Sequence, residues 1–403
     1  MDPATFDVMA MRAHFPALRE GGAAHFDGPG GSQTPDVVAK AIYDTMTSPL
    51  SNRGRFTPAE RNADQVVAGC RAAVADLVGA DPSGVVFGRS MTALTYDFAQ
   101  TMAKDWSVGD EVVVSRLDHD SNIRPWITVA ERAGAVVKWA DFDPASGELA
   151  PEVIAGLLTE RTKVVAVTAA SNLIGTMPDL ASIGGLVHAV GAWFYVDGVH
   201  FTAHHRVDVA SLGADFYACS PYKFLGPHCG VVTARPDLLG QLRPDKLLPS
   251  SDSVPERFEL GTLPYELMAG TTAAIDFLAA AVPTDGTRRD RLLRSMHAIE
   301  DYEADLAVRL EAALSGLPGL TCFSRAARRT PTLLVQFDGH DATDIQRFLA
   351  ERNVNAPAGS FYALEASRHL GLGDTGGLRI GLSPYTTAED VDRLLDALTG
   401  YFG

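Results

Sequence analysis

Two residues whose types and spacing suit covalent catalysis stand at the ends of consecutive strand-like segments. The segment WFYV is followed by Asp197, and the segment DFYAC is followed by Ser220, with Lys223 three positions further on. A lysine amine can form an imine with the aldehyde of pyridoxal 5′-phosphate (PLP). A carboxylate can keep the pyridine nitrogen of that cofactor protonated, so that the ring accepts electrons from a substrate carbanion. Alone, such a pair fits an ordinary solvated loop equally well.

Other strand-like segments also end in groups that a phosphorylated cofactor needs. Ligands of open α/β sheets gather at the carboxyl ends of the strands. Met91 and Thr92 follow the segment VVFG and begin a helical run, and a helix N-terminus is suited to a phosphate group. Serine and threonine are also common helix caps where no ligand binds.

Three polar residues are placed to contact the cofactor ring. His119 follows VVVSRLD, where it can lie over one ring face. Asn172 ends the run KVVAVTAAS, and both it and His200 are placed to contact the phenolic oxygen. Each has an ordinary alternative, because asparagine often caps a turn and a lone histidine is often a buried structural residue.

The elements that must position these residues alternate between strands and helices. Short β-branched segments occur at 85–88, 111–119, 135–142, 163–171, 193–198, 215–220 and 230–234. Helical stretches such as 63–80 and 179–192 separate most of them. Strands that are apolar on both faces and alternate with helices predict an α/β domain with a mostly parallel sheet of seven strands.

The strand and helix alternation breaks near 281–291, where the sequence reads AVPTDGTRRDR. A long helical run at 291–316 follows, and we place the domain boundary there. This predicts a large domain over 22–285 and a smaller α+β domain made of 1–21 and 286–403. The last helix of the smaller domain is predicted to begin with a capping box between Thr386 and Glu389.

Composition narrows the class of protein. The chain has 403 residues, 46% of them hydrophobic, which is enough for two domains. A net charge of -16 argues against a nucleic-acid or anionic-membrane partner. Four cysteines without a CxxC pair favour a reducing compartment. The charged N-terminal segment has no apolar core, and nowhere do about 18 apolar residues run together, so we expect a cytoplasmic protein.

The motifs in their order along the chain resemble one known family. They read F-x-R-S-x-T, D-H-x-x-N-I-x-P-W, S-N-x-x-G-T, V-D-G, D-F-Y-x-x-S-x-x-K-x-x-G-P, F-E-x-G-T and L-R-I-G-L. This order, from residue 25 to the last helix, is similar to the class V aminotransferases and, within them, to the cysteine-desulfurase-like group. The resemblance implies a PLP enzyme of the aspartate-aminotransferase-like fold that acts on an amino acid.

The resemblance also implies a role for each matching residue at the cofactor. Lys223 becomes the lysine that binds PLP, Asp197 the partner of the pyridine nitrogen, His119 the acid/base stacked on the ring, and Asn172 the contact to the phenolic oxygen. The residues implied near the phosphate are Thr92, Ser220, Tyr222, which replaces a family histidine, and Thr262, which would reach the phosphate of a neighbouring subunit.

Two further implications concern the substrate and the assembly. Arg379 matches the arginine that grips the substrate α-carboxylate, and a planar guanidinium suits a carboxylate because it binds in a bidentate way. Arg53 lies in the segment Asn52-Arg53-Gly54, which resembles the family's entrance loop but is one residue shorter. The family works as homodimers with shared active sites, as is usual for such enzymes.

One departure from the family bears on the reaction. Desulfurases carry a loop cysteine just before the carboxylate-binding arginine, whereas residues 353–379 contain none, and the nearest preceding cysteine is Cys322. We therefore expect chemistry at Cβ, by elimination or decarboxylation, on a substrate whose leaving group needs no attacking thiol. Transamination and racemisation or epimerisation stay open, because they need only Lys223 or His119 as the proton carrier.

Two alternatives of other classes are a catalytically silent PLP-binding protein and a metal-dependent hydrolase. Histidines and carboxylates ligate zinc well, but no HExxH-type spacing occurs, and we expect no metal. The residues available for such a metal site are Asp118, His119, Asp120, His200, His204, His205 and Asp208.

Overall fold

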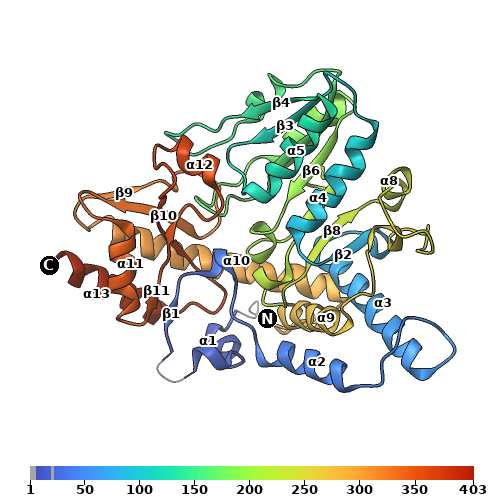
Figure 1. Ribbon diagram of the computed structural model, residues 1–403. Helices are drawn as coiled ribbons and strands as arrows, with labels where there is room; N and C mark the ends of the chain where they lie inside the picture. The colour runs from blue at the N-terminus through green and yellow to red at the C-terminus, as the bar shows by residue number, and fades with distance from the viewer. Residues whose placement is uncertain (1–5, 20–21) are drawn as a thin grey trace.

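A seven-stranded sheet dominates the computed structural model, which describes residues 6–19 and 22–403 (Figure 1). The strand order is β2-β8-β7-β6-β5-β3-β4, and β8 alone runs antiparallel to its neighbours. This confirms the predicted mostly parallel sheet, and each predicted segment contributes one strand. The strands are β2 (Val85–Gly88), β3 (Glu111–Ser115), β4 (Val136–Ala140), β5 (Thr162–Thr168), β6 (Trp193–Asp197), β7 (Phe216–Cys219) and β8 (Gly230–Ala234).

Both faces of this sheet are buried, which explains why its strands are apolar without alternation. On β6, Phe194 and Val196 belong to one core cluster, and Tyr195 between them belongs to another. Because successive side chains of a strand point to opposite faces of the sheet, each strand contributes residues to two separate cores. One core also contains residues of α4 (Met91–Met102) and α5 (Arg124–Ala133). The other contains residues of α3 (Pro58–Val78), α7 (Leu180–Ala189) and α9 (Tyr265–Ala279).

A second region, orange and red in Figure 1, is built on a four-stranded antiparallel sheet of order β12-β13-β10-β9. The long helix α10 (Arg288–Leu314) leads into it. A short parallel pair joins β1 to β11. The division into two domains stays a prediction, and this separate two-stranded pair joins an N-terminal segment to the C-terminal part of the chain. The strands of this region are β1 (Ala24–His25), β9 (Leu320–Cys322), β10 (Thr332–Phe337), β11 (Val354–Asn355), β12 (Ala358–Gly359) and β13 (Gly377–Gly381).

The remaining helices surround these sheets. They are α1 (Val8–Arg12), α2 (Asp36–Thr47), α6 (Pro151–Ala155), α8 (Pro236–Gln241), α11 (Ala342–Ala350), α12 (Leu364–His369) and α13 (Ala388–Phe402).

The start of α13 differs from the prediction by one residue. Its capping box joins Thr387 and Asp390, not Thr386 and Glu389. The hydroxyl of Thr386 accepts a hydrogen bond from the backbone N–H of Ser383 at 2.9 Å, so it is used in the preceding turn. Thr387 has the extended backbone of an N-cap and accepts from the N–H of Asp390 at 3.1 Å.

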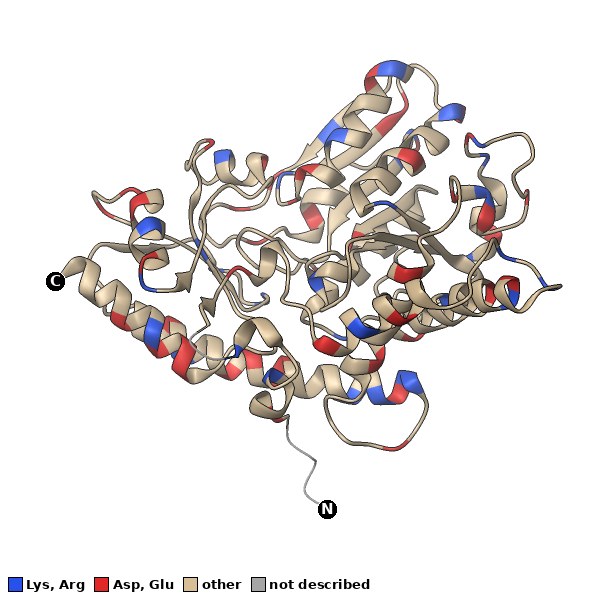
Figure 2. Cartoon of the chain, turned by 60° about the horizontal axis from the view of Figure 1, so that its bottom comes forward, with Lys and Arg blue, Asp and Glu red and all other residues tan. Residues whose placement is uncertain are grey.

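Charged residues of both signs are interspersed along the helices in the view of Figure 2. In the part of the chain that the structure describes, no helix is long and apolar enough to cross a membrane. Within the same residues, no group of three or more His, Cys, Asp or Glu side chains is arranged to hold a metal ion.

Candidate active site

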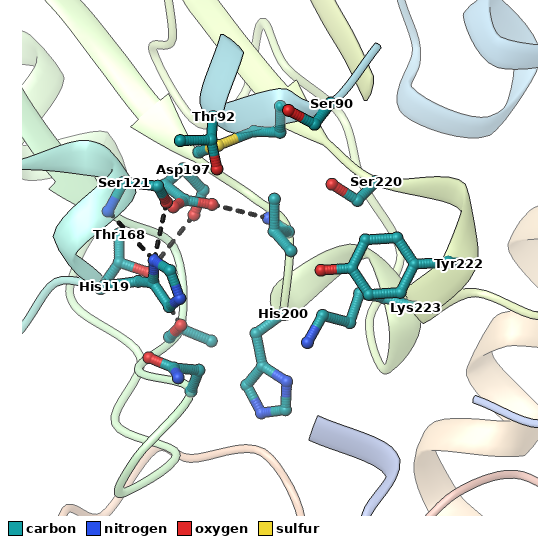
Figure 3. Close-up of a pocket in the computed structure, with 14 residues that line it drawn as sticks. Ser90, Thr92, His119, Ser121, Thr168, Asp197, His200, Ser220, Tyr222 and Lys223 are labelled. Atoms are coloured by element: carbon teal, nitrogen blue, oxygen red, sulfur yellow. Dashed lines mark hydrogen bonds between the residues drawn. The ribbon is translucent and has the colours of Figure 1, made fainter. Parts of the chain in front are cut away.

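Two adjoining cavities lie at the carboxyl ends of the parallel strands. The inner cavity (Figure 3) contains nine of the predicted site residues. The outer cavity, of about 580 Å³, shares five of these and adds Arg379. The strand ends thus bring most of the predicted site together. The nine residues of the inner cavity are Met91, Thr92, His119, Asn172, Asp197, His200, Ser220, Tyr222 and Lys223.

Asp197 ends β6 and is almost fully buried beneath the inner cavity. Its carboxylate accepts a hydrogen bond from the backbone N–H of Val199 at 2.9 Å. Burial raises the pKa of Asp197 to about 6, and the Val199 N–H and the charge of Lys223 oppose this rise. A cationic partner such as a protonated pyridine nitrogen would keep this carboxylate ionised.

Lys223 lies in the short turn after β7 and reaches into both cavities. Its ammonium contacts the carbonyl oxygen of Pro29, which comes from the N-terminal part of the chain. Burial and, to a smaller extent, the charge of Arg379 lower the pKa of Lys223, while the charge of Asp197 opposes this shift. The resulting pKa is about 7. An amine with this pKa is substantially neutral near physiological pH, as attack on an aldehyde requires.

The N-terminus of α4 lines the same cavity through Ser90, Met91 and Thr92. Ser90 caps the helix, because its hydroxyl accepts from the backbone N–H of Ala93 at 3.1 Å. Gly230 of β8 packs directly beneath this turn, and a Cβ there would lie 2.1 Å from the carbonyl carbon of Ser90. A glycine is therefore required for the helix start to approach the sheet. Such a helix start offers backbone donors to a phosphate.

His119 and Asn172 lie between the two cavities and line both. The Asn172 amide donates to the carbonyl oxygen of Phe361 at 2.9 Å, while its own side-chain oxygen is buried and has no partner. The His119 ring lies near the Tyr362 ring, with centroids 5.6 Å apart. Burial, with the charges of Lys223 and Arg379, lowers the pKa of His119 to about 4.

His200 lines the inner cavity from a turn that follows β6. Its Nε2 lies 2.9 Å from the hydroxyl of Thr330 and 3.0 Å from that of Thr332, both near the start of β10. Its Nδ1 is buried without a hydrogen-bond partner. Burial, with the nearby His204 and the charge of Lys223, lowers the pKa of His200 well below its ordinary value.

Arg379 of β13 is a buried cation of the outer cavity, which Lys223, Arg124 and Asp120 also line. The side chain is fully buried, and its Nη1 donates to the carbonyl oxygen of Asn172 at 2.9 Å. Its guanidinium carbon lies 3.6 Å from the centroid of the Phe361 ring, and its Nε has no partner. Among the described residues no carboxylate lies within 4.0 Å of the guanidinium. Burial lowers the pKa of Arg379 to about 9.

Two predicted site residues lie outside both cavities. Arg53 pairs with Asp64 at 2.8 Å and with Glu256 at 3.1 Å. Thr262 lines a separate cavity beside Arg89 and the other side of the α4 start. Their predicted roles concern an entrance loop and a neighbouring subunit, and those roles stay predictions.

The inner cavity contains buried polar atoms that have no hydrogen-bond partner among the described residues, and these atoms fit the polar groups of PLP. The buried side-chain oxygen of Asn172 and the buried Nδ1 of His200 have no partner among the described residues. Unpaired buried polar atoms are costly, so they mark places where a ligand supplies the missing bonds. With Asp197, Lys223 and the α4 start, they offer contacts for a ring nitrogen, an aldehyde, a phenolic oxygen and a phosphate.

Comparison with known proteins identifies the family. The sequence pattern of the aminotransferase class-V family matches residues 24–394. The chain belongs to this family. A PLP-dependent enzyme of the class V aminotransferase and cysteine-desulfurase-like kind is thereby confirmed, and PLP is its cofactor.

Its relatives include proteins with different names. An uncharacterized protein of Mycobacterium tuberculosis is 33% identical over 98% of both chains. The aminotransferase-like protein FGM3 of Gibberella zeae is 30% identical over 99% of both. The cysteine desulfurase CsdA of Escherichia coli is 31% identical over 98% of this chain and 97% of its own. The crystal structure of CsdA has a TM-score of 0.87 at 29% identity and covers 98% of both chains, which confirms the PLP-enzyme fold.

Several lining residues were missed by the sequence reasoning. Pro29 and Phe361 come from segments with no polar motif, and only the fold brings them to Lys223 and Arg379. Ser121 was also missed, because its backbone N–H contacts His119 and the residue type does not indicate this contact. Of the four cysteines, Cys70, Cys219 and Cys229 are buried, and none of the four lines the inner or the outer cavity.

Proposed function

We propose that this enzyme acts at Cβ of an α-amino acid, by elimination or decarboxylation, and that the leaving group departs without an attacking cysteine. The observation that carries the proposal is Arg379. It is a buried guanidinium with no paired carboxylate among the described residues, and it shares the outer cavity with Lys223. An unpaired buried charge of this kind is stabilised by an incoming anion, and a substrate α-carboxylate is such an anion.

Each residue has a definite task in this proposal. PLP, when bound, supplies the electron sink that stabilises negative charge on the substrate. Asp197 holds the ring nitrogen protonated from beneath. Lys223 holds the cofactor and, when its amine is free, accepts or returns a proton. Arg379 fixes the α-carboxylate, and thereby the orientation of the bond to be broken.

The cysteine positions support chemistry without a thiol nucleophile. Cys322 is partly buried on β9, and burial raises the pKa of its thiol, which disfavours the reactive thiolate. The position just before Arg379 that presents a cysteine in desulfurases is occupied here by a loop with Phe361 and Tyr362. Substrates that suit such a site carry a leaving group that departs unaided, such as a sulfinate, selenium or a β-carboxylate.

The proposal includes a cytoplasmic homodimer with shared active sites. Large apolar side chains are exposed on neighbouring loops and on α2, and Thr262 and Arg53 lie outside the inner and outer cavities of their own chain. A partner subunit would cover the first group and bring the second to a site. The exposed apolar residues are Tyr43, Met46, Phe56, Leu247, Leu248 and Leu260.

The test is a spectroscopic screen of the holoenzyme with L-cysteine sulfinate, L-selenocysteine and L-aspartate, followed by product analysis. We expect one of them to perturb the cofactor absorbance and to yield alanine, if Cβ takes up a proton in place of the leaving group, or pyruvate with ammonium, if the leaving group is lost by elimination. A keto acid that keeps the Cβ substituent and forms without ammonium would replace the proposal with transamination, and a D-isomer would replace it with racemisation. A spectrum unchanged by any amino acid would favour a silent PLP-binding protein.

The same screen tests Arg379. Arg379→Ala removes the partner of a buried carboxylate, which costs about 2–5 kcal/mol, or about 30-fold or more in affinity for the amino acid. Arg379→Lys keeps the charge and loses the bidentate geometry, so it should bind with intermediate affinity. Equal affinity in all three proteins would contradict the proposed carboxylate site.

A further inference from the structure

His119 makes a pair of contacts through one ring nitrogen only (Figure 3). Its Nδ1 accepts a hydrogen bond from the backbone N–H of Ser121 at 3.1 Å and lies 2.7 Å from the Ser121 hydroxyl. Both contacts arise because His119 caps the short 3-10 turn Asp120–Asn122 with its side chain. The other edge of the ring faces the open cavity in Figure 3.

The backbone contact decides which nitrogen of His119 carries the proton. A backbone N–H can only donate, so the Nδ1 that receives it must offer a lone pair. A hydrogen on Nδ1 would collide with the amide hydrogen of Ser121. A neutral imidazole has one protonated and one unprotonated nitrogen, so the proton of a neutral His119 is on Nε2.

The surroundings of His119 keep it neutral. The groups that face it are Lys223 and Arg379, both cationic when protonated, and the ring of Tyr362. Burial and these two charges lower the pKa of His119 to about 4. A neutral ring with Nδ1 occupied and Nε2 protonated has no free lone pair with which to take a proton.

We propose that Ser121 fixes His119 as the Nε2–H tautomer, so that His119 stacks on the cofactor and donates a hydrogen bond but does not serve as the base. The statement that His119 is not the base rests on the proposed function, in which Lys223 already carries the proton. The tautomer itself is a property of the holoenzyme without substrate.

His200 provides a contrast within the same cavity. Its Nε2 lies near two hydroxyls, which can donate or accept, and its Nδ1 has no partner. No donor-only group therefore fixes its tautomer. This difference makes Ser121 a positioning residue specific to His119.

The experiment is nitrogen NMR of the holoenzyme labelled with ¹⁵N-histidine, with the His119 signals assigned by their loss in His119→Gln. We expect an unprotonated Nδ1 and a protonated Nε2, unchanged from about pH 5.5 to about pH 9. A protonated Nδ1, or a ring that becomes doubly protonated near neutral pH, would overturn the proposal. Neither result depends on a substrate, so failure of the proposed function is recognised separately, from the amino-acid screen.

Two variants at Ser121 separate positioning from folding. Ser121→Ala removes the hydroxyl and keeps the backbone N–H, so the Nε2–H signal should be unchanged. Ser121→Pro removes the backbone N–H, so the preference for the Nε2–H tautomer should be lost. If the alanine variant protonates Nδ1, or the proline variant keeps the wild-type tautomer while binding PLP normally, the backbone N–H does not control the ring and the proposal fails.

Discussion

The inner and outer cavities are built in different ways, although they share Lys223 and His119. The inner cavity is formed by strand ends and helix starts around one sheet, and its key carboxylate, Asp197, is 3% exposed. The outer cavity combines a turn near Pro29, the charged start of α5 and a loop before α12 with Arg379 of the second sheet. One cavity is formed by the ends of neighbouring strands of a single sheet, and the other is assembled from segments of both sheets and the loops between them.

The loop of the outer cavity carries an unusual backbone. Phe361 has a φ of 52° and Tyr362 a φ of 58°, and such left-handed conformations cost bulky residues on the order of 1–2 kcal/mol each. Two hydrogen bonds hold them: Asn172 donates to the Phe361 carbonyl at 2.9 Å, and the Asp120 N–H donates to the Tyr362 carbonyl at 2.7 Å. Asn172, which lines both cavities, thereby helps to hold the loop of the outer cavity. We infer that the inner cavity sets the type of chemistry and the outer cavity the choice of substrate.

The largest expected effect comes from removing the shared lysine. Lys223→Ala should abolish the visible absorbance of lysine-bound PLP and lower turnover by about 10²–10⁴-fold, because a general base is lost. Absorption spectroscopy of the purified protein measures the first effect. Lys163→Ala, at the opposite end of β5, is the matched control and should keep the colour. A Lys223→Ala protein in which borohydride reduction attaches PLP covalently to the chain would show that another amine binds the cofactor.

A second prediction tests whether the charge of Arg379 in the outer cavity changes the pKa of Lys223. Burial, then the charge of Arg379, lowers the pKa of Lys223 to about 7, so the neutral amine needed for PLP attachment predominates above pH 7 and falls about tenfold per unit below it. The rate of PLP attachment to the cofactor-free protein, followed by absorbance, should rise with a midpoint near pH 7 rather than near pH 10. Arg379→Gln removes a nearby positive charge and should move this midpoint to higher pH.

The control for this pH experiment is an arginine that lies outside both cavities. Arg132→Gln, on the exposed side of α5, should leave the midpoint where it is. A midpoint that Arg379→Gln does not move would mean that the outer cavity exerts no electrostatic influence on Lys223.

Most residues of the inner cavity could be predicted, because each of them directly follows a strand-forming segment in the sequence. Strand-forming segments end in Asp197 and Ser220, and parallel strands place their carboxyl ends along one edge. The type of each residue then indicates its chemistry. Even the helix start at Ser90 and Thr92 follows from a turn of small residues next to a strand.

The outer cavity could be predicted only in part because its contacts join segments far apart in the chain. Arg379 was found through the family motif. The position of the Phe361 ring beneath it depends on a left-handed backbone conformation, which no local sequence pattern indicates. Ser121 was overlooked because its role lies in the direction of one N–H rather than in its residue type. The one-residue error at α13 has a similar origin, since Thr386 and Thr387 are alike in sequence and differ only in which turn they serve.

The smallest predicted effect tests whether the left-handed loop contributes to substrate choice. Phe361→Leu keeps apolar bulk but removes the ring 3.6 Å from the Arg379 guanidinium, a cation–π contact that contributes about 0.5–2 kcal/mol. We expect the KM for the amino acid to rise about 2- to 30-fold with kcat little changed, because the arginine is less well oriented before the chemical step. Phe348, on α11 and outside both cavities, has a ring centroid 3.4 Å from the guanidinium carbon of Arg352, so Phe348→Leu removes a comparable contact and should leave KM unaltered. If both variants behave like the wild type, the loop encloses the outer cavity without orienting Arg379, and the strain of Phe361 serves the position of Tyr362 instead.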